Sequence, residues 1–169
     1  ARGAGHEDRR QLEQAVRAVV RDCLGVREGE DVLVICNPAT HSIGEALRAE
    51  AADAGGDAVL TVISERAAHG AEPPGTVAEA MAAADVILAP TVQSLSHTVA
   101  RKRATEAGAR VATLPGVTEE MLARVMSADM EGLRRRGHAV AEALEAASGA
   151  HLADSNGTDL TLELAGRKA

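Results

Sequence analysis

The sequence predicts an α/β fold with three layers, in which helices cover both faces of an open and mostly parallel sheet. Two observations support this prediction. Short apolar runs, which are typical of strands covered on both faces, alternate with longer segments of helical periodicity. The connections between them are short, and the 169 residues of the chain are a usual length for one such domain.

Periodicity predicts the first helix and the first strand. Residues 9–24 are expected to form an amphipathic helix that stops at Gly25, because four apolar residues recur there at helical spacing. These residues are Leu12, Val16, Val19 and Val20. Residues 31–36 are a nearly continuous apolar run, which predicts a strand buried on both faces.

The second helix and strand repeat this arrangement. Ser42 and Glu45 have the spacing of a capping box, which predicts a helix that ends near Gly55. Residues 58–63 are a second apolar run and are expected to form the second strand. An irregular loop with two prolines is expected to follow over residues 64–75.

Two more pairs of elements complete the predicted sheet. A capping box that starts at Thr76 predicts a short helix rich in Ala. Residues 85–89 are expected to form the third strand and residues 110–114 the fourth. Between these strands, residues 97–107 are expected to form a helix with Ser96 as its cap.

The alternation of strands and helices favours a Rossmann-like topology with strand order 2-1-3-4. Right-handed crossovers between parallel strands leave few other arrangements. In this order the direction of winding changes between the first and third strands, where open α/β sheets usually bind ligands. Residues 37–42 and 90–97 follow these two strands, so we expect the two loops to flank one crevice.

The end of the chain has a different pattern. A stripe of apolar residues predicts a long helix that begins near residue 128. The stripe consists of Met126, Met130, Leu133, Val140 and Leu144. Alternating Leu residues on the far side of Asn156-Gly157 predict a half-buried, antiparallel β-hairpin. We therefore expect an α/β domain over residues 1–148 and a hairpin segment over residues 149–169.

Composition excludes several classes of function. The chain has no Phe, Tyr or Trp, so it lacks the stacking platforms of proteins that bind single-stranded nucleic acid. Its net charge of −7 also disfavours binding to duplexes. No apolar run is long enough to span a membrane, and the first residues lack the apolar segment of a signal peptide. These features predict a cytoplasmic protein without nucleic-acid or membrane partners.

His97 is the strongest candidate for a functional side chain. At the start of a helix the dipole disfavours its protonation, so a neutral imidazole could bind a metal or a carbonyl oxygen. Ser96-His97-Thr98 is also an ordinary helix start, with Ser96 as cap. We favour the second interpretation, in which His97 is structural.

Other polar residues of the two loops are candidates for lining the crevice. Thr91 and Ser94 precede His97, and His41 occupies a similar position after the first strand. Arg101, one turn into the helix, could hold a carboxylate, although with its neighbours it could also form a solvated face. Two histidines without Asp or Glu are an incomplete ligand set, so we expect no metal site here and assign no catalytic residue.

Three blocks of sequence together resemble the aminopeptidase T-like family of metal-dependent leucyl aminopeptidases. They are His69-Gly70-Ala71-Glu72-Pro73-Pro74, residues 85–121 with Ser96-His97-Thr98-Val99-Ala100-Arg101, and Gly157-Thr158-Asp159-Leu160-Thr161. The resemblance covers about residues 31–167 and corresponds to the amino-terminal half of such enzymes. It implies the release of amino-terminal residues from short peptides, a homodimer, and a cavity shaped by this domain.

The same resemblance implies a divalent metal, namely zinc, cobalt or manganese, in the complete enzyme. Its ligands are expected in a carboxyl-terminal catalytic domain toward which residues 149–169 would lead, and none is expected in this chain alone. Two alternatives stay open. One is an iron-dependent relative that cleaves the ring of dihydroxypyridines, and the other is a module that binds a small anion and catalyses nothing. The metal ligands of the remaining domain would separate the two enzymes.

Overall fold

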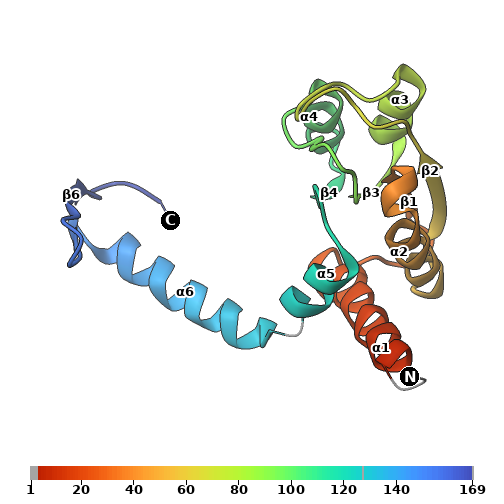
Figure 1. Ribbon diagram of the computed structural model, residues 1–169. Helices are drawn as coiled ribbons and strands as arrows, with labels where there is room; N and C mark the ends of the chain where they lie inside the picture. The colour runs from red at the N-terminus through yellow and green to blue at the C-terminus, as the bar shows by residue number, and fades with distance from the viewer. Residues whose placement is uncertain (1–3, 127, 169) are drawn as a thin grey trace. The chain divides into compact units, whose positions relative to one another are not determined.

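The computed structural model of the chain describes residues 4–126 and 128–168. It consists of two compact units, which divide between residues 127 and 128 (Figure 1). No helix among the described residues is both long enough and apolar enough to cross a membrane.

The first unit contains a parallel sheet of four strands. They are β1 (Asp31–Cys36), β2 (Asp57–Val62), β3 (Val86–Ala89) and β4 (Arg110–Thr113). The strand order is β2-β1-β3-β4, and all three pairings are parallel. This confirms the predicted α/β class and the predicted order 2-1-3-4. Each strand begins and ends within one residue of its predicted bounds.

Helices cover both faces of this sheet (Figure 1). One face carries α1 (Ala4–Arg17) with its π-helical continuation Ala18–Cys23, α2 (His41–Asp53) and α5 (Glu119–Met126). The other face carries α3 (Gly75–Ala83) and α4 (Val99–Glu106). The separate short helix α5 was not predicted. Its Leu122 is buried in the same core as α1 and α2.

The sheet separates two apolar cores because alternate strand residues point to opposite faces. In β1 and β3, Val32, Val34, Val86 and Leu88 belong to the core under α1 and α2, whereas Leu33, Ile35, Ile87 and Ala89 belong to the core under α3 and α4. All eight side chains are buried. This explains why the strands read as continuous apolar runs rather than as an alternating pattern.

Helix α2 lies close to the sheet, so the core between them is filled without the large aromatic side chains that this chain lacks. Gly44 of α2 faces β1, and a Cβ atom built there would lie 2.9 Å from the Cβ atom of Cys36. It would also lie 3.1 Å from Cδ1 of Leu60 on β2. These separations are shorter than ordinary carbon contacts. Helix α2 can therefore lie against the sheet only because residue 44 has no side chain.

An ion pair ties β4 to the segment that precedes β1. Nη2 of Arg110 lies 2.6 Å from Oε2 of Glu30, and Nε of Arg110 donates to the carbonyl of Leu24. The hydrogen bond from Arg110 is the main reason that the pKa of Glu30 lies below its ordinary value of 4.5. The carboxylate of Glu30 therefore favours the folded state.

This ion pair gives a prediction for the pH dependence of stability. Because the pKa of Glu30 is lower in the folded state, its contribution is present above the unfolded-state value and is lost as the pH falls through the folded-state value. Glu30→Gln should therefore unfold with a smaller decrease in stability between neutral and acidic pH than the unaltered protein. Denaturant titrations at several pH values, followed by circular dichroism, measure this difference. Identical pH profiles would contradict the prediction.

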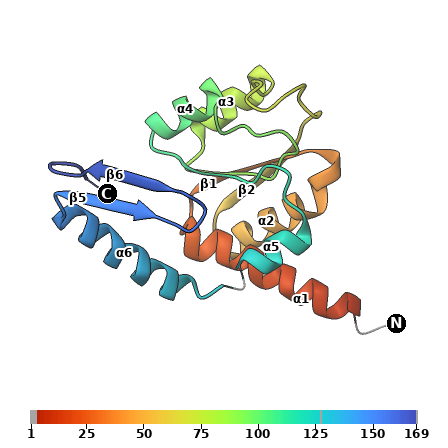
Figure 2. The same cartoon turned by 60° about the vertical axis from the view of Figure 1, so that its left-hand side comes forward.

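The second unit contains a long helix and a hairpin. Helix α6 (Met130–Ala146) begins at the cap Asp129, whose Oδ1 accepts from the backbone N–H of Gly132. Strands β5 (Gly149–Ala153) and β6 (Asp159–Glu163) pair antiparallel (Figure 2). The predicted helix and hairpin are both present. The domain boundary between residues 148 and 149 remains a prediction.

Apolar side chains of the second unit are exposed on both the helix and the hairpin. On α6 these are Leu133, Val140 and Leu144, and on the hairpin they are Leu152, Leu160 and Leu162. The register pairs Leu152 with Leu160 and Ala150 with Leu162, so the hairpin residues share one face. The predicted half-burial of the hairpin is therefore not found within this unit.

Candidate functional site at the carboxyl edge of the sheet

The loops that follow β1, β2 and β3 meet around Asn37. Its side chain is buried, and its Nδ2 donates to the carbonyl of Ile63 over 2.8 Å. Its Oδ1 accepts from the backbone N–H of Val92 over 2.7 Å. One amide thus joins three loops from different parts of the chain. Sequence reasoning did not select Asn37, although a polar residue directly after a buried strand at the expected crevice was a usable signal.

Thr40 adds a second link between the loop that follows β1 and the loop that follows β3. It ends the short 3₁₀ turn Pro38–Thr40, and its hydroxyl donates to the carbonyl of Pro90. Its Oγ1 also accepts from the backbone N–H of Asn37 over 3.0 Å. The loops after β1 and β3 are therefore held side by side at this edge, as the predicted crevice requires.

The loop between β2 and α3 packs onto the loop between β3 and α4. Nδ1 of His69 accepts from the backbone N–H of Ser94 over 2.9 Å, and the N–H of Gly70 donates to the carbonyl of Ser94 over 2.8 Å. Accepting at Nδ1 places the proton of a neutral His69 on Nε2. Residues 69–74 therefore do more than connect two elements, because they fix the position of the loop that carries the candidate residues.

Glu72 completes this attachment at the start of α4. Its two carboxylate oxygens accept from the backbone N–H groups of Val99, over 2.6 Å, and Ala100, over 3.2 Å. These N–H groups lie in the first helical turn and have no partner within the helix. A carboxylate there is also favoured by the helix dipole. The amino terminus of α4 is thus already occupied by a negative charge of the protein itself.

The cap of α4 is Thr98, so the prediction that Ser96 caps a helix starting at His97 is wrong. Helix α4 begins at Val99, and Oγ1 of Thr98 accepts from the N–H of Arg101 over 3.1 Å. Ser96 and His97 lie in the turn before it. The physical reason is that the hydroxyl of Ser96 is used in hydrogen bonds to other side chains, whereas Thr98 is buried where a cap is needed.

This correction gives a prediction for stability. Thr98→Ala should lower the free energy of unfolding by about 1–2 kcal/mol, because it removes a helix cap and a buried hydroxyl that also donates to the carbonyl of Leu95. Chemical denaturation followed by circular dichroism measures the change. Ser96→Ala is the matched control and should cost less. A larger loss for Ser96→Ala than for Thr98→Ala would restore Ser96 as the cap.

A cluster of hydroxyl groups lies between the β3–α4 loop and the end of β4. The Oγ of Ser94 donates to the Oγ of Ser96 over 2.9 Å, and the Oγ of Ser96 lies 2.6 Å from Oγ1 of Thr113. Nε of Arg101 donates to the backbone carbonyl of Ser96 over 2.8 Å. All four residues are partly buried. The structure therefore brings together three of the predicted residues, Ser94, Ser96 and Arg101, and adds Thr113.

The remaining predicted residues are placed differently. Thr91 is buried, and its hydroxyl donates to the carbonyl of Gln93, which makes it part of the loop's internal structure. His97 is exposed beside Gly70, where a built Cβ atom would lie 4.0 Å from the Cβ atom of His97. His41 is exposed at the start of α2, at the same edge of the sheet. Among the described residues, no hydrogen bond joins His41 to His97.

No metal centre is formed by the residues described in the structure. Among residues 4–126 and 128–168, no group of three or more His, Cys, Asp and Glu side chains is arranged so that it could hold a metal ion. The residues present therefore do not fit a catalytic metal, which normally takes three protein ligands.

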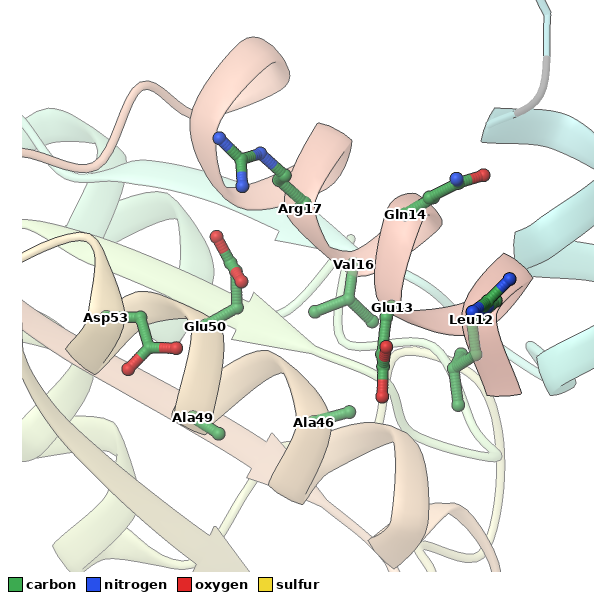
Figure 3. A pocket seen from close by; sticks show the side chains of 10 residues that line it. Leu12, Glu13, Gln14, Val16, Arg17, Ala46, Ala49, Glu50 and Asp53 are labelled. Atoms are coloured by element: carbon green, nitrogen blue, oxygen red, sulfur yellow. The ribbon is translucent and has the colours of Figure 1, made fainter. Parts of the chain in front are cut away.

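A concavity lies elsewhere, between α1 and α2 (Figure 3). It has a volume of about 770 Å³. Apolar side chains from both helices line it, together with charged ones, and the charged residues are Arg10, Glu13, Arg17, Glu50 and Asp53. It shares no residue with the cluster at the carboxyl edge. We regard the carboxyl edge as the candidate site because the loops that follow β1, β2 and β3 meet there.

Comparison with known families decides between the expected relatives. Residues 11–169 match the model of the family described as NicX: 2,5-dihydroxypyridine 5,6-dioxygenase. The chain belongs to the NicX family. This is an enzyme family, and it corresponds to the dioxygenase alternative raised by the sequence.

Two solved structures share the fold of this NicX family member. The 2,5-dihydroxypyridine dioxygenase from Pseudomonas putida KT2440 is 19% identical, with a TM-score of 0.69 over 90% of this chain and 47% of that chain. Wild-type AmpT from Thermus thermophilus is 18% identical, with a TM-score of 0.60 over 92% of this chain and 53% of that chain. The chain thus spans about half the length of each. No curated protein sequence matches it.

The resemblance to aminopeptidase T is confirmed only at the level of fold. AmpT and the dioxygenase have the same architecture as this chain, and their identities are nearly equal. The family model instead matches the dioxygenase. The assignment to an enzyme family stands, but the peptidase activity expected from the resemblance is not supported beyond the shared fold.

Proposed function

We propose that this chain is the α/β part of a ring-cleaving dioxygenase that acts on a dihydroxypyridine. The observation that carries the proposal is the match of residues 11–169 to the NicX family. In such a reaction both atoms of dioxygen enter the substrate and the bond between ring atoms 5 and 6 breaks, so no external reductant is needed. This replaces the aminopeptidase function expected from the sequence.

In this proposal the carboxyl edge of the sheet binds and orients the substrate. The cluster of Ser94, Ser96, Arg101 and Thr113 supplies hydrogen-bond donors, and His97 supplies an exposed imidazole next to it. The loop of residues 69–74 holds this edge in place through His69 and Glu72. The role of this chain is therefore to shape and polarise the cavity.

The metal of the reaction belongs to residues outside the described set. Iron is what the dioxygenase alternative implies, in place of the zinc, cobalt or manganese of an aminopeptidase, and it would activate dioxygen. The described residues contain no group that fits it. We accordingly expect this chain alone to take up no iron in a tight, stoichiometric manner. A homodimer, inferred from the resemblance, remains part of the proposal.

Substrate assays of the natural gene product test the proposed function. With ferrous iron and dioxygen, we expect it to consume 2,5-dihydroxypyridine and dioxygen in equal amounts, and to release nothing from a leucyl anilide with zinc, cobalt or manganese. An iron chelator should abolish the reaction. Release of leucine without consumption of dihydroxypyridine would contradict the proposal and support the aminopeptidase. Sedimentation of the same sample determines whether it is a dimer.

A further inference from the structure

Arg101 differs from the two cations that follow it on α4. Lys102 lies 3.7 Å from a carboxylate oxygen of Glu106, and Arg103 lies 3.2 Å from one of Glu79. Both are exposed, whereas Arg101 is partly buried. Its Nε is fixed on the carbonyl of Ser96, and among the described residues no carboxylate pairs with its two terminal nitrogens. This positive charge is therefore held in place without a counter-charge.

The side chain of Arg101 lies at the carboxyl edge of the sheet. Side chains of a helix lean toward its amino terminus, and the bond to Ser96 shows that Arg101 does so. The terminal nitrogens of a guanidinium extend beyond Nε as a planar pair of donors. Fixing Nε to a carbonyl keeps that pair in one orientation, which suits recognition of two oxygen atoms in one plane.

The hydroxyl cluster beside Arg101 has one proton more than it uses. Ser94, Ser96 and Thr113 have three hydroxyl protons, since each hydroxyl has one. One proton is used between Ser94 and Ser96, and one between Ser96 and Thr113. Whichever atom donates in the second bond, one hydroxyl proton of Ser96 or Thr113 has no acceptor among the described residues. The cluster thus adds a neutral donor at Ser96, whose carbonyl holds Arg101, or at Thr113, which Ser96 contacts.

The nearby helix terminus does not compete for the same ligand. The N–H groups of Val99 and Ala100 are already taken by Glu72, so a bound anion would find no free donor there. The carboxylate of Glu72 is in turn directed to these two N–H groups and makes no ion pair with Arg101. Donors of Arg101 and of the Ser96–Thr113 pair therefore stay available at this edge.

From these observations we propose that Arg101 and the Ser96–Thr113 hydroxyl pair form a binding site for an oxyanion. A ring carboxylate offers two coplanar oxygen atoms to the guanidinium, whereas a deprotonated ring hydroxyl offers one oxygen that accepts from both terminal nitrogens. The identification of the ligand as a dihydroxypyridine rests on the proposed function, in which the site holds a ring oxygen and so sets the orientation of the ring. The oxyanion site itself rests only on the geometry of this chain.

Nuclear magnetic resonance titrations with two probes test the site. 2,5-Dihydroxypyridine, kept under nitrogen, carries ring hydroxyls, and nicotinate carries a ring carboxylate. Binding should shift the backbone amide signals of Ser96, Arg101 and Thr113. Arg101→Met should weaken binding about tenfold or more, as expected for loss of charged hydrogen bonds. The matched control Lys102→Met should bind as the unaltered protein does.

A second pair of variants isolates the hydroxyl group. Thr113→Val should weaken binding several-fold, whereas Thr113→Ser should restore it. Amide spectra of the free variants show whether each is folded. If Arg101→Met unfolds, Arg101→Lys replaces it, because lysine keeps the charge but not the planar pair of donors. Arg101→Lys should still bind more weakly than the unaltered protein.

The outcomes separate this proposal from the proposed function. If neither probe shifts these amides, or if Lys102→Met weakens binding as much as Arg101→Met, the oxyanion site is overturned, while turnover by the gene product still decides the function. If nicotinate binds and 2,5-dihydroxypyridine does not, the site stands and the dihydroxypyridine assignment fails. If both probes bind the unaltered protein and neither binds Arg101→Met, the result supports the oxyanion site and the proposed function together.

Discussion

Asn37→Asp is expected to lower the free energy of unfolding by about 3 kcal/mol or more. The substitution keeps the size of the side chain but replaces the donor Nδ2, which now serves the carbonyl of Ile63, with an oxygen. Two acceptors would then face each other in a buried position, and a negative charge would be buried with them. The oxygen that accepts from the backbone N–H of Val92 is kept, so the loss falls on the link between the loops after β1 and β2.

Denaturant unfolding followed by circular dichroism measures this effect, because the chain has no aromatic fluorophore. Asn37→Ala should cost less, about 2 kcal/mol, since it removes the amide without adding a charge. Asn156→Asp is the matched control, because Asn156 is exposed in the hairpin turn and should lose less than about 0.5 kcal/mol. A loss below about 1 kcal/mol for Asn37→Asp would show that Asn37 does not hold the three loops together.

Gly44→Leu is expected to destabilise the first unit by about 3 kcal/mol, at the upper end for overpacked cores. The new side chain would begin 2.9 Å from Cβ and 3.0 Å from Sγ of Cys36, so α2 would have to move away from β1. Such a shift also separates α2 from its core contacts at Leu47 and Ala51. Gly44→Ala should cost about 1 kcal/mol, because the clash is smaller and Ala favours the helix.

Gly137→Ala is the control for this pair. Gly137 is also inside a helix, α6, but a Cβ atom built there meets no atom within 4 Å. The same substitution should therefore raise the stability of α6 by up to about 1 kcal/mol through helix propensity alone. Urea titrations of both Ala variants, with the helical signal as the readout, compare the two sites. An equal gain at both positions would show that Gly44 is not a close-approach glycine.

The sequence predicted the sheet well because strands that are buried on both faces consist almost entirely of apolar residues. Residues 32–36 are apolar, and the four from Val32 to Ile35 meet a core on one side of the sheet or the other. The order of the strands followed from the handedness of the crossovers, which depends on chain chirality rather than on particular residues. For the same reason the meeting of the loops after β1 and β3 at one edge could be predicted.

Helix starts were predicted less well, because hydroxyl groups have competing partners. Ser42 and Ser96 both stand where a cap is expected, yet the Oγ of Ser42 donates to Glu119 and that of Ser96 contacts Thr113. These partners are 77 and 17 residues away along the chain. A local rule that considers three or four neighbouring residues has no access to them.

By itself, the sequence determined the α/β class, the strand order and the edge of the sheet where the loops after β1 and β3 meet. These features depend on local periodicity, on chirality and on position relative to strand ends. Only the tertiary structure decided that Asn37 joins three loops, that Glu72 occupies the start of α4, and that Thr113 completes the hydroxyl cluster beside Arg101. Each of these is a hydrogen bond between residues far apart in the sequence, so its geometry exists only once the strands are packed side by side.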